Sequence, residues 1–231
     1  CFSKGERAPK IYNLNFERLI MHSYQPPLED FNFILHDFLK IEKEDIKGYN
    51  DLLPEFTRTI FKEAGKLASE VISPSNKDGD EQGCKLENGI VRTPDSFKLA
   101  FDKLREGGWL SLDIETEFGG QNLPLILSMV TNEMFTSANM SLTMYSGLSR
   151  GAYSAIFLHG SEEQKQLYLP KLASCEWTGT MNLTEPHCGT DLGLIRTKAT
   201  PCGDGSHQVS GQKIFISSGD HDLSKNIIHL V

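Results

Sequence analysis

Residues 181–200, MNLTEPHCGTDLGLIRTKAT, combine residue types that could support several kinds of chemistry. His187 and Cys188 could bind zinc together with Cys202 and His207, but their spacing lacks the short ligand pairs that preorganise a tetrahedral site. Cys188 could act as a nucleophile with His187 as its base, but neighbouring side chains on an extended chain point apart. We therefore expect neither a metal site nor a nucleophilic thiol in this segment.

Two interpretations of the segment remain after these are set aside. In one, a strand runs into a glycine-containing turn whose backbone is fixed by Glu185 and Asp191. In the other, a loop approaches an anionic cofactor, because glycine allows close backbone approach and successive N–H groups favour negative charge. The residue types of the segment alone leave both open.

The elements that must position this segment change in type once along the chain. Between about residues 28 and 174 the apolar side chains recur at helical spacing, and from about residue 177 they alternate as in strands. Within the first part, Ser161 and Gln164 predict a capping box, and Thr93 is expected to cap a helix that has Pro94 at its first position. SPSNKDGDEQG is expected to end a helix, and PCGDGS predicts a hairpin.

We therefore predict an α+β fold, in which an all-helical domain over residues 21–175 precedes the start of an antiparallel β-barrel domain over residues 176–231. Residues 1–20 lack a periodic apolar face and are expected to form a tail or upstream sequence. The last residues, KNIIHLV, read as a strand, and a strand needs a partner. We expect the chain to be a fragment of a longer protein.

The composition of the 231 residues restricts the class of protein. The net charge of −8 argues against a nucleic-acid partner, because binding the phosphate backbone requires a basic surface. No apolar run is long enough to predict a membrane span. The five cysteines are scattered and never form CxxC, which predicts reduced thiols and a cytoplasmic location.

The order of the motifs resembles that of the acyl-CoA dehydrogenase family. GWLSLDIETEFGG is followed by GSEEQKQLYLPKLASCEWTGTMNLTEPHCGTD and then by GQKIFISSG. The most specific parts are Thr184-Glu185-Pro186, Gly189-Thr190-Asp191 and the run from Gly211 to Ser217. The opening SYQPPLEDFNFIL looks closest to the longer branch of the family, which includes the methylmercaptopropionyl-CoA dehydrogenases.

The resemblance implies an enzyme that uses FAD to oxidise an acyl-CoA thioester to its 2,3-enoyl form. A strand is expected to carry Phe215 and Ser217 on one face, where they can pack on and hydrogen-bond the flavin. Thr190 is expected to contact both FAD and the acyl-CoA substrate. The residues implied to bind the cofactor are Met181, Leu183, Thr184, Gly189, Thr190, Phe215, Ile216 and Ser217.

The resemblance also bears on catalysis and on partners. Glu185 is expected to anchor its loop, and the family's catalytic base is expected beyond Val231, so no catalytic residue is assigned here. Electron-transfer flavoprotein is the expected electron acceptor, and a homodimer or homotetramer is expected. Two alternatives remain: an acyl-CoA oxidase, and an alkylation-response flavoprotein that acts by binding DNA. The acidic balance of the chain weighs against the DNA binder.

Overall fold

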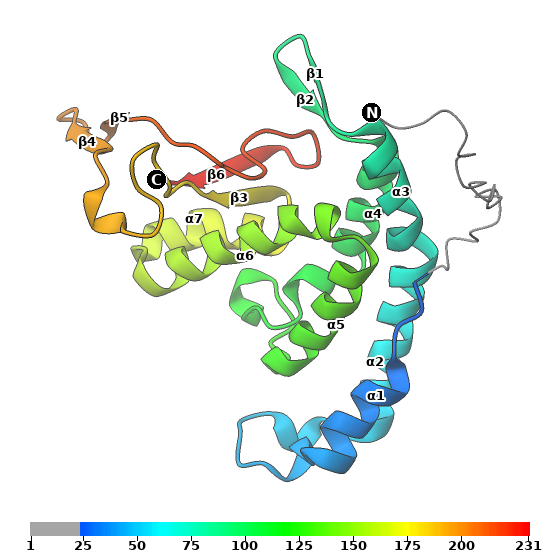
Figure 1. Cartoon of the computed structure of the whole chain (residues 1–231). Helices are drawn as coiled ribbons and strands as arrows, with labels where there is room; N and C mark the ends of the chain where they lie inside the picture. Colours follow the sequence, from blue (N-terminus) through cyan, green and yellow to red (C-terminus); the bar gives the residue numbers. More distant parts are fainter. Residues whose placement is uncertain (1–23) are drawn as a thin grey trace, which may run out of the picture.

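The computed structural model describes residues 24–231 of the chain. The tail predicted for residues 1–20 therefore lies outside the described residues. Figure 1 shows the helices gathered in the first three quarters of the chain and most of the strands at its C-terminal end. The α-helices are α1 (Leu28–Asn32), α2 (Pro54–Leu67), α3 (Ser73–Gln82), α4 (Asp95–Glu106), α5 (Leu125–Ala138), α6 (Met140–His159) and α7 (Glu162–Ala173).

The strands form three two-stranded sheets within the described residues. The strands are β1 (Lys85–Glu87), β2 (Ile90–Arg92), β3 (Trp177–Met181), β4 (Lys198–Pro201), β5 (His207–Ser210) and β6 (Asn226–Leu230). The predicted hairpin is confirmed, because β4 and β5 pair antiparallel across PCGDGS. The predicted terminal strand is β6, and its partner is β3, which precedes it and pairs with it in parallel.

The predicted change from helices to strands is confirmed, since α7 ends at Ala173 and β3 begins at Trp177. The capping box is also confirmed: the Ser161 hydroxyl accepts from the Gln164 N–H, and the Gln164 side chain accepts from the Ser161 N–H. The hairpin of β1 and β2, which interrupts the helices, was not predicted. It is a short, largely exposed pair of strands whose pattern gives little periodic signal.

Two helix boundaries were predicted wrongly. SPSNKDGDEQG does not end a helix but forms α3, which follows α2 through a π-helical turn at Ala68–Ile72. Close packing explains this, because a Cβ on Gly79 would lie 2.7 Å from the Phe97 ring, so the glycine admits the ring against the helix. The helix α4 begins at Asp95 with Pro94 at its N-cap, and Thr93 instead donates to Asp222.

The core lies in two clusters that continue into one another through α6. The larger cluster is formed by α1 to α6, with Phe61, Phe101 and Phe135 among its fully buried side chains. In the smaller cluster, α6 and α7 pack with Phe118 and with the apolar side chains of β6. The β3 strand lies close against α6, since a Cβ on Gly179 would be 2.4 Å from the Cβ of Ala152. The helical core thus forms the support on which β3 and the following loops rest.

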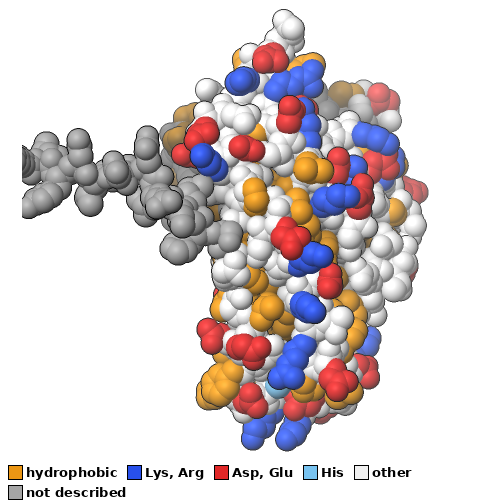
Figure 2. All heavy atoms as spheres, turned by 90° about the vertical axis from the view of Figure 1, so that its right-hand side faces the viewer, with side chains coloured by type: hydrophobic (Ala, Val, Ile, Leu, Met, Phe, Trp, Pro, Cys, Tyr) orange, Lys and Arg blue, Asp and Glu red, His pale blue; other side chains and the backbone are white. Residues whose placement is uncertain are grey.

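The surface formed by α1 to α4 carries mixed charges. Figure 2 shows Lys and Arg side chains interleaved with Asp and Glu over this face, with apolar side chains between them. Exposed apolar side chains in the α1–α2 region include Phe33, Phe38 and Leu53. Along residues 24–231, every helix is too short or too polar to span a bilayer.

Candidate functional site

Thr184 joins the two sequence motifs that were expected to share a site. Its carbonyl oxygen accepts a hydrogen bond from the Ile214 N–H at 3.1 Å. Its side chain packs against Gly189, where an added Cβ would lie 3.3 Å from Thr184 Cγ2. One residue earlier, the carbonyl oxygen of Leu183 accepts from Lys213 Nζ at 3.0 Å. The structure therefore brings Leu183, Thr184 and Gly189 against the segment that leads into Phe215.

Glu185 anchors this junction by accepting hydrogen bonds, as the sequence predicted. Its Oε1 accepts from the Thr197 hydroxyl at 2.6 Å, from the Thr197 N–H at 3.0 Å and from Lys213 Nζ at 3.1 Å. Its Oε2 accepts from the Arg196 N–H at 2.8 Å. The Thr197 hydroxyl and the backbone N–H groups lower the pKa of Glu185 to about 2. A carboxylate held in this way is a poor proton acceptor near neutral pH, so Glu185 is a structural residue.

The residues of the metal interpretation are only partly brought together. Among residues 24–231, ligand atoms of one group of three possible metal ligands lie within 4.8 Å of one another: Glu185, His187 and Cys188. The Glu185 oxygens are occupied by four donors, and His187 Nε2 lies 2.9 Å from the Leu194 carbonyl oxygen, to which it donates. Glu185 and His187 Nε2 are thus engaged in hydrogen bonds within the loop, and the absence of a metal site here stays a prediction. Cys202 and His207 lie outside this group, in the turn and the second strand of the β4–β5 hairpin.

Residues Phe215–Ser217 do not form the predicted strand. The chain bends at Phe215, which has φ of +56°, and turns at Ser217 and Ser218, of which Ser218 has φ of +57°. The alternation that would place Phe215 and Ser217 on one face is therefore lost. The Phe215 ring is 88% exposed, which leaves its flat face open to a ligand. β3 pairs with β6 along its full length.

The remaining predicted residues differ in burial and in contacts. Met181 ends β3 and faces α6, where a Cβ on Gly151 would be 3.4 Å from Met181 Cγ. Thr190 is exposed beside Gly189, and Ile216 is half-buried. Within the described part of the chain, the hydroxyls of Thr184, Thr190 and Ser217 make no hydrogen bond. Hydroxyls can hydrogen-bond the polar edges of a planar ligand, and an exposed aromatic ring can stack on its face.

Sequence reasoning assigned no role to several residues that build the site. Lys213 belongs to the GQKIFIS run, so its place in that motif was the available signal. Thr197 and Asp222 were not singled out, because their roles arise from contacts between distant segments. Asp191 acts locally, since its Oδ1 accepts from the Gly193 N–H at 3.1 Å, as the turn interpretation predicted.

Comparison with known proteins identifies the family of the chain. The family model described as "Acyl-CoA dehydrogenase, N-terminal domain" matches residues 54–176. The 3-methylmercaptopropionyl-CoA dehydrogenase of Ruegeria pomeroyi is 40% identical over 210 residues, which are 90% of this chain and 36% of that protein. The chain belongs to the acyl-CoA dehydrogenase family. It spans little more than a third of the length of this curated relative.

Solved structures show the same fold. The crystal structure of an acyl-CoA dehydrogenase from Geobacillus kaustophilus has a TM-score of 0.58 and 30% sequence identity, covering 71% of this chain and 40% of that chain. An acyl-CoA dehydrogenase from Bacillus anthracis, solved in complex with FAD, has a TM-score of 0.60 and 24% identity. That match covers 76% of this chain and 29% of the other, and it supports the fold alone.

Proposed function

We propose that the protein containing this chain is an FAD-dependent acyl-CoA dehydrogenase, which oxidises an acyl-CoA thioester to its 2,3-enoyl form. The observation that carries the proposal is the junction at which Lys213 and Ile214 bind the carbonyl groups of Leu183 and Thr184. It joins the two motifs of the family resemblance in space. The identity to the Ruegeria pomeroyi enzyme supports the same reaction class.

The residues at the junction fit FAD by their chemistry. Phe215 offers an exposed aromatic face, and the hydroxyls of Thr184, Thr190 and Ser217 are free to pair with polar edges. Gly189 is exposed and has no side chain to block a ligand, and the side chain of Thr184 packs against it. We propose that these residues, with Met181, Leu183 and Ile216, hold the cofactor. Thr190 is proposed to contact the acyl-CoA substrate as well.

When bound, FAD supplies the hydride acceptor that oxidation of an acyl chain requires. The share of this chain is to bind and orient, because fixed geometry removes much of the entropic barrier between two reactants. Glu185 does not act as the base, since four donors occupy its oxygens. We propose that the base is contributed from beyond Val231, as the family resemblance implies.

The partners follow from the same proposal. We propose an acyl-CoA as substrate and electron-transfer flavoprotein as electron acceptor. We also propose a cytoplasmic homodimer or homotetramer, with no nucleic-acid partner. Size-exclusion chromatography with light scattering measures the oligomeric state of the full-length protein, and a monomer contradicts that part.

The reaction is tested with the purified full-length protein loaded with FAD under anaerobic conditions. Butyryl-CoA, octanoyl-CoA and 3-methylmercaptopropionyl-CoA are added separately, and the visible flavin absorbance is followed. Bleaching by at least one of these substrates, with the 2,3-enoyl product found by mass spectrometry, is the expected result. Bound flavin that none of them bleaches contradicts the proposal.

The same preparation separates a dehydrogenase from an oxidase. In air, an oxidase reoxidises its flavin with oxygen and releases hydrogen peroxide at each turnover. The proposed dehydrogenase turns over slowly in air and rapidly once electron-transfer flavoprotein is added. Peroxide formation equal to substrate consumption assigns the protein to the oxidases instead.

A further inference from the structure

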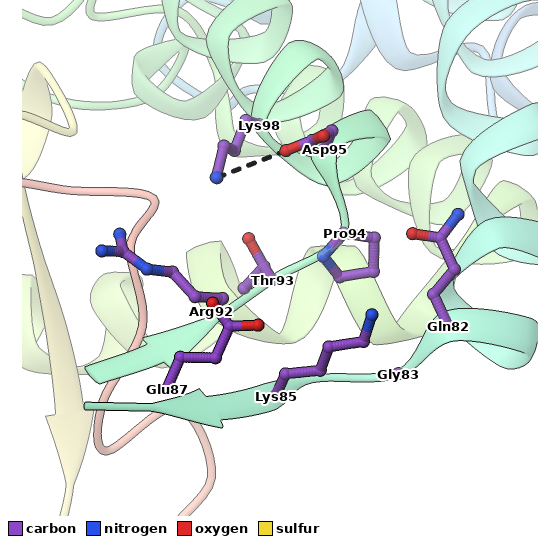
Figure 3. Close-up of a pocket in the computed structure, with 9 residues that line it drawn as sticks. All are labelled: Gln82, Gly83, Lys85, Glu87, Arg92, Thr93, Pro94, Asp95 and Lys98. Carbon is purple, nitrogen blue, oxygen red and sulfur yellow. Dashed lines mark hydrogen bonds and ion pairs between the residues drawn. The ribbon is translucent and has the colours of Figure 1, made fainter. Parts of the chain in front are cut away.

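Asp222 joins the turn that follows Ser217 to the helical part of the molecule through hydrogen bonds and ion pairs. Asp222 Oδ1 accepts from the Thr93 N–H at 3.0 Å and from the Thr93 hydroxyl at 2.8 Å. Its Oδ2 lies 3.0 Å from Lys98 Nζ and 3.5 Å from Arg92 Nη1. Figure 3 shows these three partners lining one pocket, where β2 runs into the start of α4.

The Asp222 contact is a charge-assisted cluster in which the carboxylate is the buried partner, while Lys98 and Arg92 reach it from the surface. The Asp222 side chain is only 8% exposed. Burial by itself would raise the pKa of Asp222, but the Thr93 N–H and Lys98 outweigh it and hold that pKa well below its usual range. Hydrogen bonds to an ionised carboxylate are about twice as strong as neutral ones. The contact therefore persists at neutral pH.

Two neighbours reinforce the attachment of this turn. Asp220 Oδ2 accepts from the Val91 N–H at 3.3 Å. The buried His221 ring packs edge-on against Tyr145 of α6, and its Nε2 lies 3.0 Å from the Thr178 hydroxyl in β3. Residues 220–222 thus contact β2, α4, α6 and β3.

The segment between the two attachments holds an unfavourable backbone conformation. Phe215 and Ser218 both have φ in the left-handed region, which costs a non-glycine residue energy. Such residues persist only where the surrounding structure over-determines them. Before this segment, the Ile214 N–H donates a hydrogen bond to the Thr184 carbonyl oxygen. After it, the Asp222 carboxylate accepts a hydrogen bond from the Thr93 N–H.

We propose that Asp222 is a positioning residue, which acts through the β2–α4 junction to hold residues 215–218 in the conformation that receives the flavin. The link to flavin rests on the proposed function. The effect on the backbone does not, because it concerns the chain without ligand. Asp222 touches no reacting atom and acts on the site only through the segment it restrains.

Full-length Asp222→Ala and Asp222→Asn test the proposal, with Thr93→Val as a milder variant that keeps the carboxylate and its two cations. Asp80→Asn, at an exposed α3 position, is the matched control. Hydrogen–deuterium exchange of the protein without FAD is measured over residues 213–222, with residues 162–173 of α7 as an internal reference. FAD dissociation constants and flavin absorbance spectra are then recorded for each variant.

We expect exchange of the Ile214 N–H, which donates to the Thr184 carbonyl oxygen, to rise about tenfold in Asp222→Ala, the factor that corresponds to a lost charge-assisted hydrogen bond, with α7 unchanged. The FAD dissociation constant should rise in the order Thr93→Val, Asp222→Asn, Asp222→Ala, and the flavin spectrum should shift. Asp80→Asn should match the wild type. An amide at residue 222 keeps shape but loses charge, so Asp222→Asn remains informative if Asp222→Ala fails to fold.

The outcomes separate this proposal from the proposed function. Unchanged exchange over residues 213–222 in folded Asp222→Asn and Asp222→Ala overturns the positioning role. A lower melting temperature with unchanged FAD affinity and spectrum also overturns it and makes Asp222 merely structural. If the wild type binds no FAD, the proposed function fails, and a local rise in exchange then supports the backbone restraint while overturning its link to flavin.

Discussion

Lys213 Nζ lies 3.1 Å from Glu185 Oε1, and this ion pair joins residues 28 positions apart in the sequence. Lys213 is 12% exposed and the Glu185 side chain only 2%, so the pair is largely removed from water. The same ammonium group also reaches the Leu183 carbonyl oxygen. The pair is thus the electrostatic centre of the junction on which the proposed cofactor site is built.

Lys213→Met should destabilise the full-length protein, because it leaves a buried carboxylate without its cation. The expected fall in melting temperature is on the order of 5 °C. Lys225→Met is the matched control, since Lys225 is 76% exposed and 3.5 Å from Glu176, and exposed pairs contribute little. Equal melting temperatures for the two variants would contradict the central role of Lys213.

The contribution of Glu185 should depend on pH in a defined direction. Its folded-state pKa of about 2 lies below the ordinary value of 4.5, so its stabilisation is present above about pH 4.5 and lost as the pH falls toward 2. Urea midpoints of wild type and Glu185→Gln should differ at pH 7 and converge as the pH falls from about 4.5 toward 2. A difference in urea midpoint that stays constant down to pH 3 would argue against this ionisation.

Gly179→Ala should be costly because β3 lies against α6. The added Cβ would be 2.4 Å from the Cβ of Ala152, and overpacking of this kind typically costs about 1–3 kcal/mol. Gly147→Ala, in α6, meets nothing within 4 Å and should be neutral or stabilising by up to about 1 kcal/mol. Urea unfolding of both variants measures the contrast, and a loss of stability in Gly147→Ala alone would refute the packing argument.

Thr190→Val should weaken binding of FAD, of acyl-CoA or of both, because it removes a hydroxyl while keeping the shape of the side chain. One hydrogen bond is worth about 1 kcal/mol, which corresponds to roughly a fivefold change in dissociation constant. Thr200→Val, at an exposed position in β4, is the control. If Thr190→Val leaves both FAD affinity and acyl-CoA turnover at wild-type values, Thr190 does not belong to the site.

Much of the fold could be predicted because it depends on residues that are close together in the sequence. The capping box at Ser161 and the Asp-Gly hairpin depend on residues close in sequence, and both were predicted correctly. The helix over Ser73–Gln82 was missed because Phe97, distant in sequence, packs against Gly79 and outweighs the local preference for a turn. The parallel pairing of β6 with β3 likewise joins segments that are far apart in the sequence.

The candidate site shows the same division. The anchoring role of Glu185 was predicted from its place in a compact motif, and its four donors bear this out. The strand predicted for residues 215–217 was wrong. The alternation of apolar side chains does not reveal the left-handed backbone conformation of Phe215, which depends on contacts with distant residues. Asp222 gave no signal, since its partners Thr93 and Lys98 are more than a hundred residues away.

The central claim, that this junction receives FAD, is tested most directly by Phe215→Ala. Because the Phe215 ring is 88% exposed, its removal should leave the melting temperature of the protein without FAD unchanged. Phe38→Ala, which removes a ring that is 73% exposed in the turn after α1, is the control.

The measurement is the FAD dissociation constant of the full-length protein, determined by flavin fluorescence titration. We expect the FAD dissociation constant to be about tenfold larger for Phe215→Ala, since a covered aromatic face contributes both apolar burial and stacking, and unchanged for Phe38→Ala. Phe215→Ala that binds FAD as tightly as the wild type would contradict the account.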